Sequence, residues 1–404
     1  MNVFQTMYSR LFQGILYVMS RIIVFRIPET TERLEDIPRL LSKNRVKRPI
    51  LVVSNTVSKS ERFQVFKKLL KKNDIEFALY TGVSPDPTIK AIDVLTGFYK
   101  SHECDSVIAI GGGSVIDAAK ATAVLATYPK KKISNFKGAL KIHRKLPYFI
   151  AVPTTAGTGS EATIAAVVVD EDNNDKFSIT DGHLVPKVAV LDDSLLIGIP
   201  KNIISTTGID AFCHALESYL GRNKNKLSYE KSLASMKLIK ENLVEFYNDS
   251  NNSTARANMQ TASFYAGIAL TRGYVGYVHA LAHSIGGLYH KPHGYCVAIL
   301  LPYVLEAYER KVYKKLAKLA VYLGLVDNNK STRDKSQALI DYIKKTNHDL
   351  GIPKGFDGLI QDSDMEFLAS HASKEANPWY PVPKELDKEE LKDILILANL
   401  NGKR

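Results

Sequence analysis

Short apolar runs alternate with stretches of helical periodicity between about residues 45 and 195, and this alternation limits the fold more than any other feature of the chain. The runs 50–54, 106–110 and 148–152 are apolar almost throughout. Strands of that kind are buried on both faces, as in a parallel sheet that helices cover on both sides. We therefore predict an α/β domain here. Its other predicted elements are strands at 77–80, 165–169 and 188–191 and helices at 63–70 and 115–127.

The pattern changes after Pro200, where long helical stretches follow one another between polar breaks. A chain of 404 residues is long enough for two domains. We predict the fold class α/β plus all-α, with an α/β domain over 28–199 and a helical domain over 200–404. The predicted helices of the second domain cover 208–220, 228–247, 255–270, 279–289, 312–323, 336–350 and 384–397.

Residues 1–27 have the apolar spacing of an amphipathic helix and contain no acidic residue. A membrane crossing is excluded because only ten residues separate Arg10 from Arg21, whereas about twenty apolar residues are needed. A secretory signal is excluded because no early basic region and no small-residue cleavage site are present. A packing helix or subunit contact, an interfacial membrane helix and an organellar transit segment remain, and we favour packing. The apolar positions are Phe4, Met7, Tyr8, Leu11, Phe12, Ile15, Leu16, Met19, Ile22 and Ile23.

The formal net charge of +12 is spread over the chain in short lysine clusters. We interpret these clusters as solvated surface and expect no nucleic-acid partner. The three cysteines, Cys104, Cys213 and Cys296, are far apart and form no CxxC pair. This spacing disfavours disulfides and thiolate zinc sites and favours a reducing compartment, so we expect a cytoplasmic protein without a membrane partner.

Two loops rich in small residues directly follow predicted strands. The first, 110–117, reads Ile-Gly-Gly-Gly-Ser-Val-Ile-Asp and opens a predicted helix. Glycines let a backbone approach a phosphate, and a helix N-terminus supplies N–H groups and a positive dipole end. Ser114 and Asp117 also fit a capping pattern that merely starts the helix. The second loop, 153–161, reads Pro-Thr-Thr-Ala-Gly-Thr-Gly-Ser-Glu. Because α/β sheets bind ligands at the carboxyl ends of their strands, the pair of loops predicts a ligand site.

Four of the ten histidines lie within the fifteen residues 279–293. His279 and His283 are four residues apart and share one face of a predicted helix, as do Asp210 and His214. His293 lies in Lys-Pro-His-Gly, which we expect to be a turn. Either pair alone occurs often on helices, but together with the His-Gly turn they predict a site for a divalent cation.

The ordered motifs of the chain resemble those of the iron-containing (group III) alcohol dehydrogenases. The similarity runs from about Arg48 to the C-terminus, so the first 27 residues lie outside it. It implies a Rossmann-like N-terminal nucleotide-binding domain, a helical metal-binding domain of dehydroquinate synthase-like architecture, and an active-site cleft between them. The motifs are 111–120 (GGGSVIDAAK), 153–161 (PTTAGTGSE), 186–192 (PKVAVLD), 208–214 (GIDAFCH), 279–283 (HALAH) and 292–294 (PHG).

The resemblance assigns roles to residues of each domain. It implies that NAD or NADP is the cofactor, with the pyrophosphate held at 112–114. His283 would lie beside the nicotinamide as a candidate proton relay, whereas His290 matches no ligand of the family. The implied cofactor residues are Gly112, Gly113, Ser114, Thr154, Thr155, Thr158, Lys176 and Leu191. The implied ligands of the metal, usually Fe2+ with Zn2+ as the other option, are Asp210, His214, His279 and His293.

Asn55 stands where many members of the family have an aspartate that selects NAD by binding the ribose. Asparagine lacks the charge that repels a 2′-phosphate, so both NAD and NADP stay open. A divalent ion held by one carboxylate and three neutral imidazoles keeps a net positive charge and acts as a Lewis acid on a substrate oxygen. We therefore expect hydride transfer between the nicotinamide and a small alcohol or aldehyde. His283 is the predicted proton carrier.

Two other functions compete with this interpretation. A zinc-dependent polyol dehydrogenase of the glycerol dehydrogenase type has a similar architecture, but such enzymes typically use one aspartate and two histidines. His214 is therefore the residue that discriminates between the two. A non-catalytic protein that binds nucleotide or metal is the second alternative, and the presence of every expected ligand argues against it. We expect the chain to form a homo-oligomer, in the simplest case a dimer.

Overall fold

The computed structural model describes residues 3–22, 25–173, 175–223 and 225–400. The chain forms two compact units that exchange segments. One consists of Met1–Val24, Pro200–Asp249 and Ile268–Arg404, and the other of Phe25–Ile199 and Ser250–Gly267. The α/β unit therefore includes a segment of a later helix, α9 (Ser253–Gly273). The helical unit includes the N-terminal helix α1 (Val3–Ile22).

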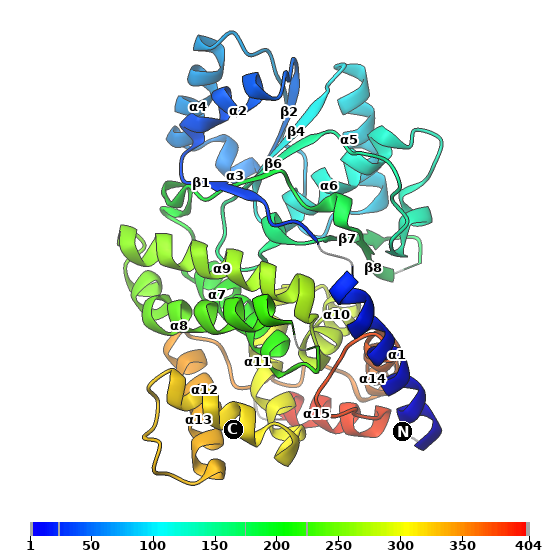
Figure 1. Cartoon of the computed structure of the whole chain (residues 1–404), viewed down its shortest axis with the longest axis vertical. Helices are drawn as coiled ribbons and strands as arrows, with labels where there is room; N and C mark the ends of the chain where they lie inside the picture. The colour runs from blue at the N-terminus through cyan, green and yellow to red at the C-terminus, as the bar shows by residue number, and fades with distance from the viewer. Residues whose placement is uncertain (1–2, 23–24, 174, 224, 401–404) are drawn as a thin grey trace. The chain divides into compact units, whose positions relative to one another are not determined.

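A six-stranded parallel sheet with the order β1-β9-β6-β4-β2-β3 forms the core of the α/β unit (Figure 1). Every residue of β2 and β4 is buried, because helices cover the sheet on both faces. Its strands are β1 (Glu29–Thr31), β2 (Pro49–Val53), β3 (Ala78–Tyr80), β4 (Ser106–Gly111), β6 (Tyr148–Pro153) and β9 (Val188–Val190). The helices of the unit are α2 (Ile37–Lys43), α3 (Asn55–Ser58), α4 (Glu61–Lys72), α5 (Ile89–Ser101) and α6 (Gly113–Thr127).

The predicted strand at 165–169 belongs to a separate three-stranded sheet with the order β5-β8-β7. In it, β7 (Ala165–Asp170) pairs antiparallel with β8 (Asp175–Thr180), and β5 (Gly138–Ala139) pairs with β8. Neither β5 nor β8 was predicted from the sequence, because β5 has only two residues and β8 combines charged and apolar residues without a continuous apolar run.

The helical unit is built around α7 (Lys201–Leu220), in which every residue from Gly208 to Leu220 is buried. A helix that is buried on all sides is typical of the centre of a bundle. Helix α7 packs against α8 (Lys226–Asn248) and α11 (His293–Ala307), and α11 packs in turn against α10 (Tyr277–Tyr289). The remaining helices are α12 (Tyr313–Tyr322), α13 (Thr332–Asp349), α14 (Asp362–Ala376) and α15 (Lys388–Leu400).

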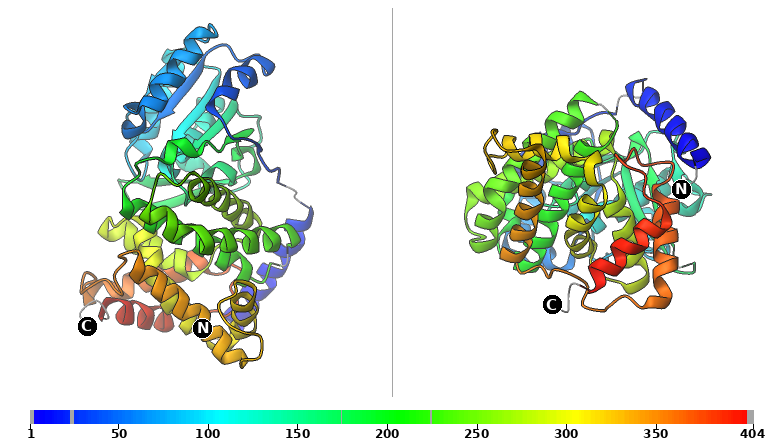
Figure 2. Two further views of the ribbon diagram at one scale, coloured as in Figure 1. Left: turned by 90° about the vertical axis from the view of Figure 1, so that its left-hand side faces the viewer. Right: turned by 90° about the horizontal axis from the view of Figure 1, so that it is seen from below.

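Helix α1 lies alongside the rest of the helical unit (Figure 2), and the side chains that it buries there, among those described, are polar. Ser9 and Gln13 are buried, and Gln13 Nε2 donates a hydrogen bond to Tyr380 O at 2.9 Å. Arg10 donates to Val382 O at 2.9 Å and forms an ion pair with Glu385 at 3.1 Å. The prediction of a helix in this segment agrees with α1. The expectation that the apolar stripe packs within the same chain is wrong for Met7, Tyr8, Leu11 and Ile15, which are exposed, and packing against another subunit stays a prediction.

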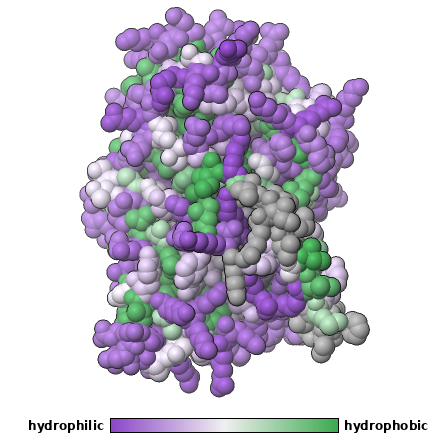
Figure 3. All heavy atoms as spheres, in the orientation of Figure 1, coloured by the Kyte–Doolittle hydropathy of each residue, from purple (hydrophilic) through white to green (hydrophobic). Residues whose placement is uncertain are grey.

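Most of the described apolar side chains of α1 face outward and form a hydrophobic area on the surface (Figure 3). Met7, Tyr8, Leu11 and Ile15 are 61%, 62%, 67% and 53% exposed. Phe12 contacts Trp379 at 4.9 Å between ring centroids. Helical periodicity identifies residues that share a face but does not say which face meets the protein. None of the helices in the described part of the chain combines the length and apolarity that a membrane crossing requires.

Candidate metal centre and cofactor loops

Three helices of the helical unit bring together Asp210, His214, His279 and His293. Asp210 and His214 lie one turn apart on α7, His279 lies on α10, and His293 is the first residue of α11. Each of the four offers one ligand atom, and these atoms all lie within 4.8 Å of one another. Asp210 Oδ1 is 3.5 Å from the Nε2 atoms of His279 and His293 and 3.9 Å from that of His214. The structure therefore brings together the four residues that the family resemblance implied.

The expected turn at His293 is a helix start. Pro292 is the N-cap of α11 in an extended conformation (φ −55°, ψ 132°), and both His293 and Gly294 lie inside the helix. Proline is well tolerated just before a helix because it has no N–H to leave unbonded. A Cβ on Gly294 would lie 2.6 Å from Thr206 O on α7. The glycine is therefore required for the close approach of α11 to α7, which places His293 beside Asp210.

The electrostatics of the cluster suit a cation. Asp210 and His279 are each only 2% exposed, and neither Asp210 Oδ1 nor His279 Nε2 forms a hydrogen bond with any described residue. Burial would raise the pKa of Asp210, but the neighbouring imidazoles of His214 and His293 hold that pKa well below its ordinary value. Burial lowers the pKa of His293 to about 4, so this ring is neutral at neutral pH. Buried polar atoms are rarely left unbonded, so this donor set fits a divalent metal ion.

His283 lies beside the cluster but makes different contacts. Its ring stacks on that of His293 at a centroid distance of 5.0 Å, and its Nδ1 lies 2.7 Å from Glu375 Oε1. Tyr380 donates its hydroxyl hydrogen to the same oxygen at 2.7 Å. Burial would raise the pKa of Glu375, but His283 and Tyr380 hold it below its ordinary value. The ionised Glu375 therefore holds His283 through Nδ1, which leaves Nε2 as the atom that can exchange a proton.

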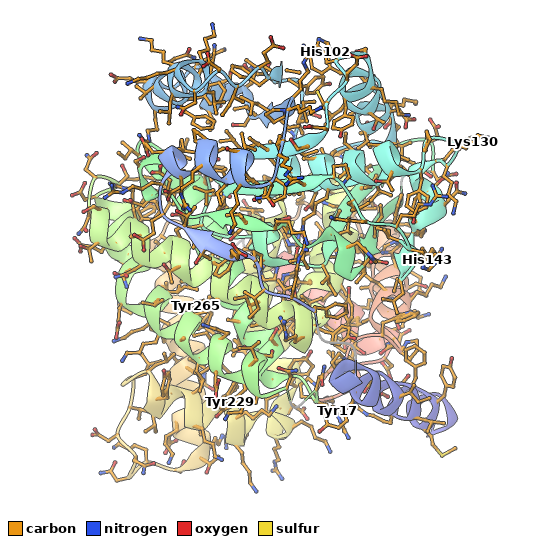
Figure 4. All side chains as sticks on the ribbon, turned by 45° about the horizontal axis from the view of Figure 1, so that its top comes forward. Tyr17, His102, Lys130, His143, Tyr229 and Tyr265 are labelled. Atoms are coloured by element: carbon orange, nitrogen blue, oxygen red, sulfur yellow. The ribbon has the colours of Figure 1, made fainter. Side chains whose placement is uncertain are left out.

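Three of the other histidines are exposed and lie outside this group. His290 is exposed and ends α10 in the left-handed conformation (φ 52°), a common helix end. In the α/β unit, His102 and His143 are exposed and lie at the edge of the structure (Figure 4).

In the α/β unit, the predicted cofactor residues follow the carboxyl ends of neighbouring strands. Asn55 follows β2, 112–114 follow β4, 154–158 follow β6, and Leu191 follows β9. Gly111 at the end of β4 pairs with Pro153 at the end of β6, so the two glycine-containing loops start side by side. A shared edge of this kind is where α/β sheets bind nucleotides.

The two loops touch at their glycines. A Cβ on Gly113 would lie 2.7 Å from Thr158 Cγ2, and one on Gly112 would lie 3.4 Å from Thr155 Oγ1. Gly112 is the N-cap of α6, so Ser114 lies in the first turn of that helix and near its free N–H groups. The expected capping role of Asp117 is wrong, because its carboxylate accepts hydrogen bonds from Ser160 Oγ and Val167 N.

The other predicted cofactor residues lie at the same edge or are connected to it. Thr154 is buried, and its N–H donates to Gly111 O at 3.0 Å. Lys176 lies on β8 and pairs with Asp86 at 2.6 Å, and Asp86 N donates to Ser114 Oγ at 3.3 Å. Asn55 is exposed at the start of α3.

Lys120 ends the motif 111–120, and no role for it was predicted from the sequence. Its buried ammonium donates to Ser160 O, Thr163 O and Ala165 O at 2.7, 3.0 and 2.8 Å. Helix α6, which starts at the first glycine loop, thereby holds the end of the second loop. Glu217, Glu375 and Tyr380 were also missed. The histidine partners of Glu217 and Glu375 are distant in sequence, and Tyr380 lies beyond the end of α14, the helix that carries its partner Glu375. The only available signal was for Glu217, which lies seven residues after Asp210 and three after His214 and so shares their face of α7.

Comparison with known proteins identifies the family. The family described as "Iron-containing alcohol dehydrogenase" matches residues 26–193, and "Fe-containing alcohol dehydrogenase family, C-terminal" matches residues 204–398. Alcohol dehydrogenase 4 of Saccharomyces cerevisiae is 35% identical over 77% of this chain and 80% of its own length. The solved structure of an alcohol dehydrogenase from Oenococcus oeni is 32% identical, covers 93% of this chain and 99% of its own, and superposes with a TM-score of 0.89.

Two further relatives differ in the nucleotide that their names specify. The NAD-dependent methanol dehydrogenase of Bacillus methanolicus is 30% identical over 76% of this chain and 80% of its own length. The NADPH-dependent butanol dehydrogenase of Clostridium saccharobutylicum is 30% identical over 80% of this chain and 84% of its own length.

These matches, together with the parallel-sheet and helical units, define the protein class. It is an oxidoreductase that acts on alcohols or aldehydes. The chain belongs to the iron-containing alcohol dehydrogenase family. The predicted family, fold class and enzyme class are thereby confirmed, and neither the polyol dehydrogenase nor the non-catalytic alternative is favoured.

Proposed function

We propose that this chain transfers hydride between NAD(P) and a short aliphatic alcohol or aldehyde, with one divalent metal ion held by Asp210, His214, His279 and His293. Ferrous iron is our first choice for the ion, and zinc is the second. The observation that carries the proposal is the buried carboxylate of Asp210, within 3.9 Å of three imidazole Nε2 atoms. A single carboxylate neutralises only part of the charge of a divalent ion, so a net positive charge remains at the place where a substrate oxygen would bind.

The metal, when bound, supplies a Lewis acid that makes the substrate hydroxyl more acidic and the aldehyde carbonyl more polar. Asp210 and the three imidazoles position the ion and exchange no protons. His283 donates its Nδ1 hydrogen to Glu375, so its neutral ring presents a lone pair on Nε2. Through this atom it accepts the hydroxyl proton during oxidation and returns it during reduction. The nicotinamide cofactor, when bound, would supply the donor or acceptor of the hydride.

We propose that residues 28–199 carry the cofactor site and 200–404 the metal site. Gly112, Gly113 and Ser114 would hold the pyrophosphate at the N-terminus of α6. Thr154, Thr155, Thr158, Lys176 and Leu191 would line the rest of the groove, with Asn55 at the adenosine ribose.

We also propose a cytoplasmic homodimer. The three cysteines are buried and form no disulfide among the described residues, which supports a reducing compartment. The exposed apolar side chains of α1 are the surface that we expect at a contact between subunits. Sedimentation velocity of the full chain would test the dimer, and a monomer at micromolar concentration would contradict it.

The test of the proposed activity is anaerobic oxidation of NADH and NADPH with a short aldehyde. Metal-stripped protein would be reconstituted with Fe(II) or Zn(II) before the assay. We expect no turnover without metal and turnover restored chiefly by iron. Tight stoichiometric metal binding without turnover on any aldehyde from two to six carbons would contradict the substrate class, and absence of metal binding would contradict the site.

Asn55 gives a prediction about the nucleotide. An Asn55→Asp variant places a negative charge directly after β2, where it would repel the 2′-phosphate of NADPH. We expect the ratio of kcat/KM for NADPH to that for NADH to fall at least about tenfold, because one unfavourable charge contact costs on the order of 1–2 kcal/mol. Steady-state kinetics with both nucleotides would measure the ratio.

The matched control is Asn73→Asp, the same chemical change at the exposed C-cap of α4. Helix α4 runs back from the carboxyl end of β2, so its C-terminus lies at the opposite edge of the sheet. The control should leave the ratio unchanged. An Asn55→Asp enzyme with the wild-type ratio would show that this position does not contact the ribose.

A further inference from the structure

Glu217 is a buried carboxylate that the proposed reaction does not use. It lies on α7, and its side chain is only 3% exposed. The carboxylate accepts hydrogen bonds from Gly276 N at 2.7 Å and Val278 N at 2.9 Å, both at the start of α10. It also lies 2.6 Å from His279 Nδ1. Three donors thus converge on one side chain in the interior of the helical unit.

These contacts determine which nitrogen of His279 carries the hydrogen. A carboxylate that accepts from two backbone N–H groups has only acceptor oxygens to offer, so the imidazole must donate from Nδ1. The lone pair of the neutral ring is then on Nε2, 3.5 Å from Asp210 Oδ1. We propose that Glu217 is a positioning residue of the metal site, which holds His279 in the tautomer and orientation that present Nε2 to the ion. The inference rests on the proposed metal site and adds a residue to it.

The local structure accounts for how a carboxylate fits there. Asp210, His214 and Glu217 lie on one face of α7, and this face meets the start of α10. A Cβ on Gly276, the N-cap of α10, would lie 2.7 Å from Glu217 Oε1. Only glycine at this position allows the carboxylate to reach both the backbone and the ring. The N-terminus of α10 further favours a negative charge.

A competing arrangement uses Glu217 as a ligand. Cys213, Glu217 and His279 form a second buried group whose ligand atoms lie within 4.8 Å of one another. In that arrangement His279 would bind through Nδ1, which lies 3.9 Å from Cys213 Sγ. However, Nδ1 already contacts Glu217, and the group offers three residues, whereas the Asp210 group offers four. The geometry therefore favours the arrangement in which Glu217 holds His279 over the one in which Glu217 itself binds the ion.

The test compares metal affinity in Glu217→Gln and wild type, measured by chelator competition with Zn(II) and with Fe(II) under anaerobic conditions. The amide keeps the shape but offers one acceptor oxygen and two N–H donors, so it cannot accept from all three groups. We expect metal affinity to fall about 10–100-fold, as is typical when the hydrogen-bond partner of a metal-binding histidine is removed. Wild-type affinity in Glu217→Gln would overturn the inference.

Glu375→Gln is the matched control. Glu375 holds His283 at 2.7 Å, which is the same kind of carboxylate–histidine contact, half-buried, one turn further along α10 on a histidine outside the donor group. We expect this variant to keep wild-type metal affinity. An equal loss of affinity in both variants would overturn the inference, because it would reflect a general loss of charge or packing.

Thermal melting without and with metal distinguishes a positioning role of Glu217 from a merely structural one. If Glu217 only joins α7 to α10, the variant lowers the melting temperature of the metal-free protein and leaves the metal-induced increase unchanged, which contradicts the inference. We expect the metal-induced increase itself to shrink. Spectra of metal-free wild type with 15N-labelled histidine, assigned with His279→Ala, should show hydrogen on Nδ1 of His279. A ring with hydrogen on Nε2 and none on Nδ1 would overturn the inference even if the variant does not fold. A wild type that binds no metal would instead remove the proposed site.

Discussion

We expect His279→Ala to abolish stoichiometric metal binding and to lower turnover more than about 100-fold. Lewis-acid stabilisation by a bound metal is worth several kcal/mol, and each 1.36 kcal/mol is a factor of ten in rate. His279 is the most enclosed of the three imidazoles, at 2% exposure, and lies at the centre of the group. Its ring contacts those of His214 and His293 at 4.4 and 5.4 Å. Metal analysis after gel filtration and aldehyde reduction with NAD(P)H would measure the two effects.

The control for this variant is His348→Ala, on α13 of the same unit, where the side chain is 81% exposed. It should keep both metal and turnover. If His279→Ala retained one metal per chain and wild-type turnover, the four-residue group would not be the catalytic metal site. A folded variant without metal but with full activity would likewise show that the reaction does not need the ion.

The second large effect is expected on stability, for Lys120→Met. Lys120 is 1% exposed and donates to three backbone carbonyls and to the hydroxyls of Ser160 and Thr163. Burial lowers the pKa of this ammonium to about 8, although the charges of Asp117 and Glu161 partly offset the effect of burial. Methionine fills the same space without donors, so the carbonyls and the two carboxyl groups lose their partner. We expect the free energy of unfolding to fall by about 3–5 kcal/mol, as when one member of a buried ion pair is removed.

Urea unfolding followed by circular dichroism would measure this loss. Lys68→Met, at an exposed position of α4, makes the same change where no buried group depends on the charge, and we expect it to change the unfolding free energy by less than about 0.5 kcal/mol. A loss below about 1 kcal/mol for Lys120→Met would mean that the second glycine loop does not depend on this lysine.

Much of the fold could be predicted because its signals are local. Continuous apolar runs indicate buried parallel strands, and β2, β4 and β6 agree with the predicted positions. Spacing by four residues placed Asp210 with His214 and His279 with His283 on common helix faces. The glycine loops could be placed because they follow strands. The ligand group itself came from the family resemblance, and its role in metal binding stays a prediction.

The remaining features depend on contacts between distant segments. Periodicity predicted α1, but its polar face packs through Arg10 and Gln13. The Lys-Pro-His-Gly sequence indicates a change of chain direction, but Pro292 is the N-cap of α11 there. Gly294 lies inside α11 and allows the helix to approach Thr206 of α7 closely. Lys120 and Glu217 look like ordinary helix residues in sequence, because the carbonyls and the imidazole that they bind lie on other elements.

The central claim is that one metal ion binds among Asp210, His214, His279 and His293. The most direct test is anomalous diffraction at the iron and zinc absorption edges from crystals of anaerobically reconstituted protein. We predict a single strong peak per chain, in contact with Asp210 and with Nε2 of the three histidines. A peak among Cys213, Glu217 and His279 Nδ1, or no peak within this helical unit, would contradict the account.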